Sequence, residues 1–305
     1  MMARSLSPGA LVLRRFVRHR MAVGGGVVLL SLALFALCAP LFEIWIGVEV
    51  DTINLLDRFS DPSSSHPLGT DELGRDVFVR LLYGGRVSLF VGLTAAMSAA
   101  IIGVVIGLLA GYFGGWSDKI LMRFTDGVIS LPLLPLLIVL AAIDPAKVGF
   151  DTSNETNLGL YRIIFIVALV GWTTVARLVR STTLTLKHRP FVLAAHAQGA
   201  GPWRVMAVHI LPNLASPIIV ATTLSAGNVI LLESVLSFLG LGIQPPLPSW
   251  GNLLTNAQEL IWNAPSLAFY PGALIFITVI ALNFVGDGLQ DALDPRAVPG
   301  SSESP

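Results

Sequence analysis

The sequence is poor in charged residues. Only 12% of its 305 residues are Asp, Glu, Lys or Arg, whereas 54% are hydrophobic; soluble domains carry about 25% charged residues. A chain of this composition has too little polar surface to enclose a water-soluble core, which excludes an ordinary soluble domain and predicts an integral membrane protein. The formal net charge is zero, so the charge gives no reason to expect nucleic acid as a partner.

Cysteine is nearly missing, and the common catalytic motifs are wholly missing. The single cysteine, Cys38, lies inside an apolar run and permits no internal disulfide. The sequence contains no GxxxxGK[ST] phosphate loop, no HExxH, no CxxC and no GxSxG, patterns that hold nucleotides, metals or a nucleophile. We therefore predict that the chain is not an enzyme, has no catalytic or metal site and binds no cofactor of its own.

What the sequence does contain is a series of apolar runs, and a bilayer-spanning helix needs about 20 such residues. A signal peptide is the other interpretation of the first run, but a signal peptide's apolar core is shorter, about 7–15 residues. Two prolines, Pro132 and Pro135, interrupt the third run. We predict an all-α integral membrane protein with six transmembrane helices, at Met21–Phe42, Val87–Gly111, Gly127–Ile143, Leu160–Val179, Leu214–Leu236 and Ser266–Gly286.

The basic residues predict which segments face the cytoplasm. Of the 19 Lys and Arg residues, 13 fall on the side of the N-terminus and 6 on the other side, and cytoplasmic loops carry the excess. Both termini are therefore predicted to be cytoplasmic, and segment 237–265 extracytoplasmic. The predicted units are a basic N-terminal segment at 1–20, a first span at 21–42, an extracytoplasmic segment at 43–86, a core at 87–290 and a cytoplasmic tail at 291–305.

A polar loop at 181–213 separates the fourth and fifth runs, and from Pro190 it reads PFVLAAHAQGAGPWRVMAVHILPN. Pro190 can open a short helix at its first position. Gly199 can end that helix, because glycine adopts the left-handed conformation without a Cβ penalty. Pro202 then starts a second short helix, predicted to end at Pro212.

Small side chains keep the first of these helices thin, so that it could seat in a groove on a partner protein. Gly199 is interpreted as the hinge of the loop, with an ordinary helix cap as the alternative. The residues assigned to this coupling loop, which is predicted to take a push from a separate protein, are Phe191, Leu193, Ala194, Ala195, Gln198, Gly199 and Pro212.

Two polar residues lie inside otherwise apolar spans. Glu233 could contact an amino group of a transported solute, or it could cap backbone N–H groups of the turn Ser237–Gly242; the structural role is favoured. Asn283 is expected to form a hydrogen bond between helices, worth about 1 kcal/mol.

Two further patterns concern packing and the outer segment. Glycines at 103, 107 and 111 form a stripe at four-residue spacing that would let another helix approach closely. In the segment 43–86, the charged residues Asp71, Arg75 and Asp76 fit either a docking surface for a partner or a local network of ion pairs.

The stretch LAAHAQGAGPWRVMAVHILPN resembles the cytoplasmic "EAA" loop of bacterial ABC importer permeases, in which Glu-Ala-Ala is followed by glycine and then by I-x-L-P. Ala194-Ala195, Gly199 and Leu211-Pro212 fit this pattern, whereas Leu193 replaces the Glu and His209 the Ile. The stretches HPLGTDELGRDVFVRLLYGGR, LESVLSFLGLGIQPPLPSWGNLL and DGLQDALDPR resemble the peptide/nickel subfamily, the "C"-type subunit of dipeptide and oligopeptide importers.

The resemblance implies a type I ABC importer fold in the bacterial plasma (inner) membrane, forming half of a pathway that imports peptides or a related small solute by alternating access. The implied partners are a sister permease subunit, two ATP-binding subunits that hold ATP and Mg, an extracytoplasmic substrate-binding protein and membrane lipid. An ion-coupled secondary transporter that uses Glu233 is the alternative. Such a protein is expected to have intramembrane carboxylates or unwound helices in two repeated halves of the chain.

Overall fold

The computed structural model describes residues 8–143 and 155–294. The predicted tail beyond Asp294 and the start of the predicted N-terminal segment lie outside these ranges. Within them the chain is helical and has no β-strand, only an isolated bridge between Thr70 and Asp76. Five helices are long and apolar enough to cross a membrane, or six if the bent pair α5–α6 counts as one span. This confirms the predicted all-α membrane fold.

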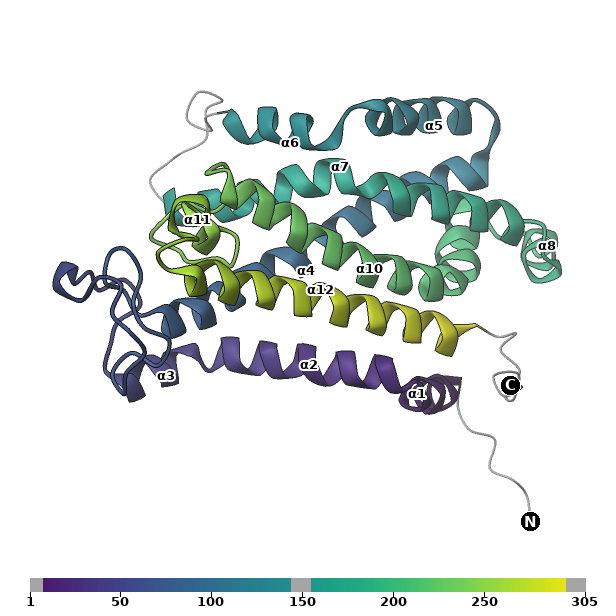
Figure 1. The fold of residues 1–305 in the computed structure, drawn as a ribbon. Coiled ribbons are helices and arrows are strands. Elements are labelled where there is room, and N and C mark those ends of the chain that lie inside the picture. The colour runs from purple at the N-terminus through teal and green to yellow at the C-terminus, as the bar shows by residue number, and fades with distance from the viewer. Residues whose placement is uncertain (1–7, 144–154, 295–305) are drawn as a thin grey trace, which may run out of the picture.

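The helices lie roughly side by side, so that the connecting segments gather at two opposite ends (Figure 1). The bounds are α1 Pro8–Arg18, α2 Arg20–Leu37, α3 Ala39–Ile46, η1 Leu55–Asp57, α4 Val77–Phe113, α5 Gly115–Ser130, α6 Leu133–Ala142, α7 Glu155–Leu186, α8 Pro190–Ala197, α9 Pro202–Arg204, η3 Val205–Ile210, α10 Leu211–Phe238, η4 Asn252–Leu254, α11 Ala257–Leu260 and α12 Pro265–Leu293. Helices α1 and α8 lie at one end of the bundle, and α3 and α11 lie at the other (Figure 1).

Two of the predicted spans are broken at prolines. The first is not one helix over 21–42, because α2 ends at Leu37 and α3 begins again with Pro40 in its first turn. The third divides into α5 and α6, which meet at an angle of 87°. Leu131, which precedes Pro132, has extended backbone (φ −76°, ψ 138°), as the residue before a proline prefers.

The second short helix of the polar loop does not end at Pro212, contrary to the prediction. Helix α9 runs directly into the π-helical segment η3 and then into α10, which has Pro212 in its first turn. Pro212 has no N–H to donate to the preceding turn, so it interrupts the hydrogen-bond ladder of this continuous helix. The wider π-helical turn changes the hydrogen-bond register of the helix before the proline is reached. Helices α9, η3 and α10 therefore form one continuous helix from the loop into the fifth span.

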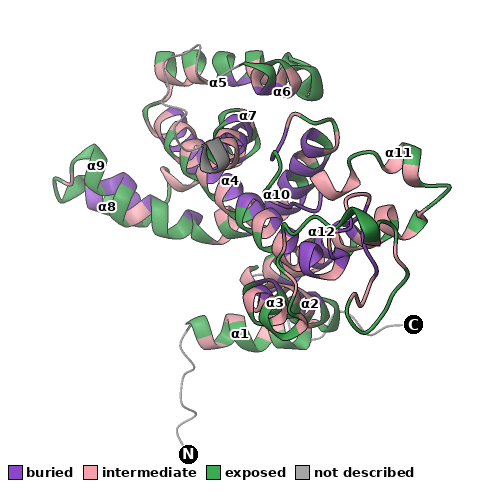
Figure 2. Ribbon diagram, turned by 90° about the vertical axis from the view of Figure 1, so that its left-hand side faces the viewer, coloured by how far each residue is buried: buried purple, intermediate pink, exposed green. Residues whose placement is uncertain are grey.

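The glycine stripe packs α4 closely on α7, as predicted. A Cβ on Gly103 would lie 2.6 Å from the carbonyl oxygen of Trp172, and one on Gly107 would lie 2.5 Å from that of Ala176. Atoms do not approach this closely, so any larger residue would force the helices apart. The buried core forms around this pair, with α10 and α6 contributing further apolar side chains (Figure 2).

Candidate functional site

Helix α8 is a short, well-capped helix at one end of the bundle. Pro190 occupies its first turn, where the missing N–H costs nothing. At its other end Gly199 has φ +82°. The N–H of Ala200 donates to Ala195 O at 3.0 Å, and that of Gly199 donates to His196 O at 2.9 Å. This pair of bonds is a Schellman motif, so the predicted cap is present.

One side of α8 packs on its own chain and the rest is exposed. Val192 is fully buried and Ala195 is 7% exposed, both in an apolar cluster with α4, α7 and η3. Phe191 is 42% exposed and Leu193 54% exposed. Ala195 therefore fastens α8 to the bundle and exposes little surface. The other residues assigned to the coupling loop, Ala194, Gln198, Gly199 and Pro212, are exposed, although Pro212 belongs to α10.

Aromatic rings also hold the loop against the end of α4. The ring of His196 stacks on Tyr112 with centroids 6.2 Å apart, and Trp203 meets Phe113 edge-on at 6.2 Å. His196 is thus part of the packing, and no group of three or more potential metal ligands exists among the described residues. These contacts tie the loop to the end of α4.

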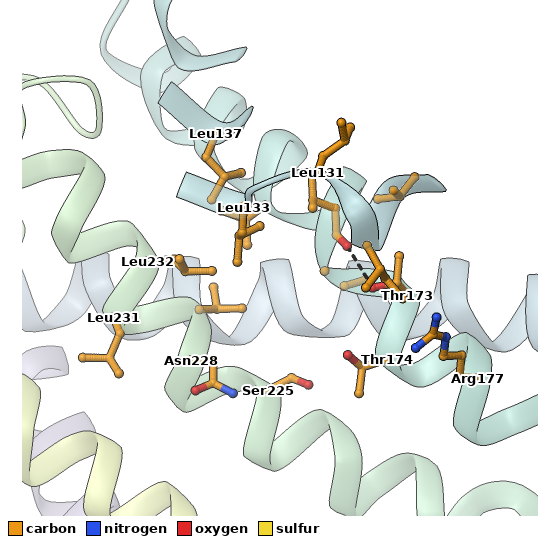
Figure 3. A pocket seen from close by; sticks show the side chains of 17 residues that line it. Leu131, Leu133, Leu137, Thr173, Thr174, Arg177, Ser225, Asn228, Leu231 and Leu232 are labelled. Atoms are coloured by element: carbon orange, nitrogen blue, oxygen red, sulfur yellow. Dashed lines mark hydrogen bonds between the residues drawn. The ribbon is translucent and has the colours of Figure 1, made fainter. Parts of the chain in front are cut away.

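Helices α7 and α10, which precede and follow the loop that contains α8, line a cavity edged by polar residues. It has a volume of about 620 Å³ and is closed on another side by α5 and α6. Figure 3 shows leucines of the broken span facing Thr174 and Arg177 of α7 and Ser225 and Asn228 of α10. These four residues could not be predicted as cavity residues from the sequence, because single polar residues in apolar helices form no motif.

Two ion pairs fasten α5 to α7 beside this cavity. Arg177 Nη2 lies 2.6 Å from Asp126 Oδ1. Arg180 binds Asp118 through two guanidinium nitrogens, and Nη2 donates to Oδ2 at 2.6 Å. These bonds hold the first half of the broken span on the face of α7.

Glu233 is buried and lies away from the cavity. Its carboxylate accepts hydrogen bonds from Ser237 Oγ at 2.7 Å and from Ser88 Oγ at 3.2 Å. Those hydroxyls accept in turn from the N–H groups of Ile243 and Trp250 at 3.1 Å. Glu233 therefore orders the segment after α10 through two serines rather than by capping the Ser237–Gly242 turn directly. The structure supports its predicted structural role and gives no support to an ion-coupled site.

The structure also shows the surroundings of Asn283 and of the charged residues in the segment 43–86. Asn283 is exposed on α12 and its side chain forms no hydrogen bond with any described residue, so the expected bond between helices is not made among the described residues. In the outer segment, Arg75 Nε lies 2.8 Å from Asp71 Oδ2, and Asp76 caps α4 and contacts His66 Nδ1 at 3.0 Å. Asp71 and Arg75 therefore form a local ion pair, whereas Asp76 holds the start of α4.

Comparison with known proteins agrees with this architecture. Residues 103–299 match the family model described as binding-protein-dependent transport system inner membrane component, and residues 7–46 match the N-terminal TM domain of oligopeptide transport permease C. The chain is 41% identical to the oligopeptide transport system permease protein of Escherichia coli over 93% of this chain and 89% of that protein.

Two further relatives cover similar lengths. The oligopeptide transport system permease protein of Bacillus subtilis is 38% identical over 96% of this chain and 91% of that protein. The glutathione transport system permease protein of Pectobacterium atrosepticum is 39% identical over 93% of this chain and 89% of that protein. The chain belongs to the family of binding-protein-dependent transport system inner membrane components, the multi-pass plasma-membrane permease subunits of bacterial ABC importers.

Proposed function

We propose that this chain is one of two permease subunits in an ATP-driven importer of peptides or of a related small solute, and that α8 receives the movement of an ATPase subunit. The relatives named for oligopeptide and glutathione transport support the substrate class. The position of α8 in the chain, between the two helices that line the cavity, supports the coupling role. Helix α8 follows α7 in the chain and is joined through α9 and η3 to α10, and α7 and α10 line the cavity of about 620 Å³.

The contact with the ATPase is apolar in this proposal. Leu193 occupies the position where the family pattern has a glutamate, and it is 54% exposed beside Phe191. The residues of α8 include no acidic side chain. Affinity at this surface therefore comes from burying the exposed parts of Leu193 and Phe191 and not from a carboxylate. Each side chain is already about half covered, so the gain is about half of the roughly 1.5–3 kcal/mol that complete burial of such a side chain contributes.

The remaining partners follow from the two ends of the bundle. The sister permease completes the pathway around the cavity bordered by Thr174 and Asn228. Two ATP-binding subunits, which hold ATP and Mg, act at the end that carries α8, and a substrate-binding protein delivers solute to the end that carries α11 (Figure 1). Hydrolysis on separate subunits makes this chain a non-catalytic component, and the proposal includes no nucleic acid partner.

Site-directed crosslinking tests the ATPase contact. In a Cys38→Ser background, which removes the only natural cysteine, Leu193→Cys should crosslink to an ATPase subunit in the assembled importer. Ala195→Cys is the matched control, because it lies two residues away on the same helix but is buried. Equal crosslinking of both variants, or none at Leu193→Cys, would overturn the proposed contact.

Reconstituted transport tests the energy source. Uptake of a peptide by the complete importer in proteoliposomes should stop when the ATPase subunits are inactivated by mutation. Uptake that continues without ATP hydrolysis would contradict the proposal. The same preparation, offered peptides and glutathione in parallel, measures which solute class is imported.

A further inference from the structure

The N-terminal helix α1 lies across the end of the bundle and not along it. It is seen end-on in Figure 1, where α2 runs lengthwise, and lengthwise in Figure 2 after a 90° turn. Because α2 is a candidate membrane span, α1 is oriented parallel to the plane of the membrane. It also lies next to the point where α2 begins at Arg20, which is the expected level of the lipid headgroups.

Specific contacts hold α1 in this orientation. Arg15 Nη1 donates to the carbonyl oxygen of Asp294 at 2.8 Å, beyond the end of α12. His19 caps α2 by accepting from the N–H of Ala22 at 3.1 Å, and its Nε2 lies 3.6 Å from Asp291. The ring of Phe16 lies over Gly288 of α12. Helix α1 is therefore fixed to the bundle and presents a defined outer surface.

That outer surface is strongly amphipathic. Leu13 and Val17 are one turn apart on the same face, and they are 63% and 59% exposed. Arg14, Arg18 and Arg20 are also exposed, and no described acidic residue forms an ion pair with them. The helix contains no acidic side chain. Exposed apolar residues beside unpaired arginines match an interfacial helix, whose apolar face enters the boundary between headgroups and acyl chains.

We propose that α1 is a membrane-surface anchor, with Leu13 and Val17 inserted among lipids and Arg14 and Arg18 bound to anionic headgroups. Charge complementarity identifies the lipid bilayer as the partner of this surface of α1, because a bilayer rich in anionic lipid offers both negative charge and an apolar layer along one flat surface. Each arginine near such a surface contributes about a fivefold preference for anionic lipid. The anchor would fix the first span at a constant depth while other helices move.

Depth measurement with a matched pair of leucines tests this proposal. Leu11 is 43% exposed and lies two residues before Leu13, which places it about 200° around the helix. Single cysteines at the two positions, in a Cys38→Ser background, are labelled with an environment-sensitive fluorophore in the assembled importer. The importer is reconstituted in nanodiscs that contain spin-labelled lipid.

Quenching by the spin-labelled lipid should be strong for Leu13→Cys and weak for Leu11→Cys. Replacing Arg14 and Arg18 by Gln should lower the enrichment of anionic over zwitterionic lipid near the label, by about fivefold for each arginine removed. Equal quenching at the two positions would overturn the proposal. A Leu13 label that is shielded from water but not quenched by lipid would also overturn it, because a protein partner would then cover this face.

Discussion

Adding a single methyl group to Gly199 tests whether the end of α8 must keep its left-handed turn. The backbone at Gly199 has φ +82°, and a Cβ built there meets no atom within 4 Å. Gly199→Ala therefore introduces backbone strain without a steric clash. Gly201→Ala is the matched control, because its Cβ also meets nothing and its φ of −70° suits any residue.

The energetic cost of Gly199→Ala follows from the left-handed backbone conformation at this position. An L-residue with a Cβ pays roughly 1–2 kcal/mol to adopt it, which shifts the balance between the capped and the frayed helix end by about 5- to 30-fold. The two hydrogen bonds made by the N–H groups of Gly199 and Ala200 are lost when the end frays. The side chains of Leu193 and Gln198 would then have no fixed orientation toward a partner.

Two measurements on the assembled importer follow these consequences. Hydrogen exchange at the amide of Ala200 should be about 5- to 30-fold faster in Gly199→Ala than in wild type, and peptide uptake per ATP hydrolysed should fall. Gly199→Asn should recover much of the loss, because asparagine tolerates the left-handed region. If Gly199→Ala behaved like Gly201→Ala in both assays, the turn would not be needed for coupling.

Four further substitutions probe the packing and the energy source. Glu233→Gln should lower the free energy of unfolding by about 1–3 kcal/mol, because one buried serine loses its hydrogen-bond acceptor. Peptide uptake by this variant should still depend on ATP and be unaffected by proton uncouplers. Inhibition of uptake by uncouplers would instead support an ion-coupled transporter. Gly85→Ala should lower the melting temperature, because its Cβ would lie 2.8 Å from Trp250 Cζ2 and overpacking costs about 1–3 kcal/mol; an unchanged melting temperature would contradict this packing. Asp118→Asn and Arg180→Gln should show a coupling energy of about 0.5–3 kcal/mol in a double-mutant cycle of stability, and purely additive effects would mean that the pair does not fasten α5 to α7.

The local features of the fold were predictable from the sequence. Apolar runs identify α2, α4, α7, α10 and α12, because each helix must be apolar over the width of a bilayer. The bounds of α8 follow from Pro190 and Gly199, whose backbone preferences act within one turn. The spacing of Gly103 and Gly107 predicted a close helix contact, although only the structure identified α7 as the partner.

Features that depend on distant residues were not predictable. The link from Ser88 to Glu233 joins positions 145 residues apart, and a lone serine in an apolar helix gives no signal of its partner. The burial of Ala195 depends on how α8 rotates onto η3, which the composition of α8 does not determine. A proline such as Pro212 usually marks a helix boundary, so the continuation through a π-helical turn could not be expected from local preference.

The packing also determines how a push on α8 would reach the cavity. Helices α4 and α7 are in backbone contact along the glycine stripe, so they must move together. The other route, through α9 and α10, contains the π-helical segment η3 and, inside α10, Pro217, both of which are sites where helices bend. A displacement of α8 would therefore pass to α7 as a rigid movement and be absorbed in part by bending toward α10. The two helices that border the cavity would then shift relative to each other, and alternating access requires such a relative movement.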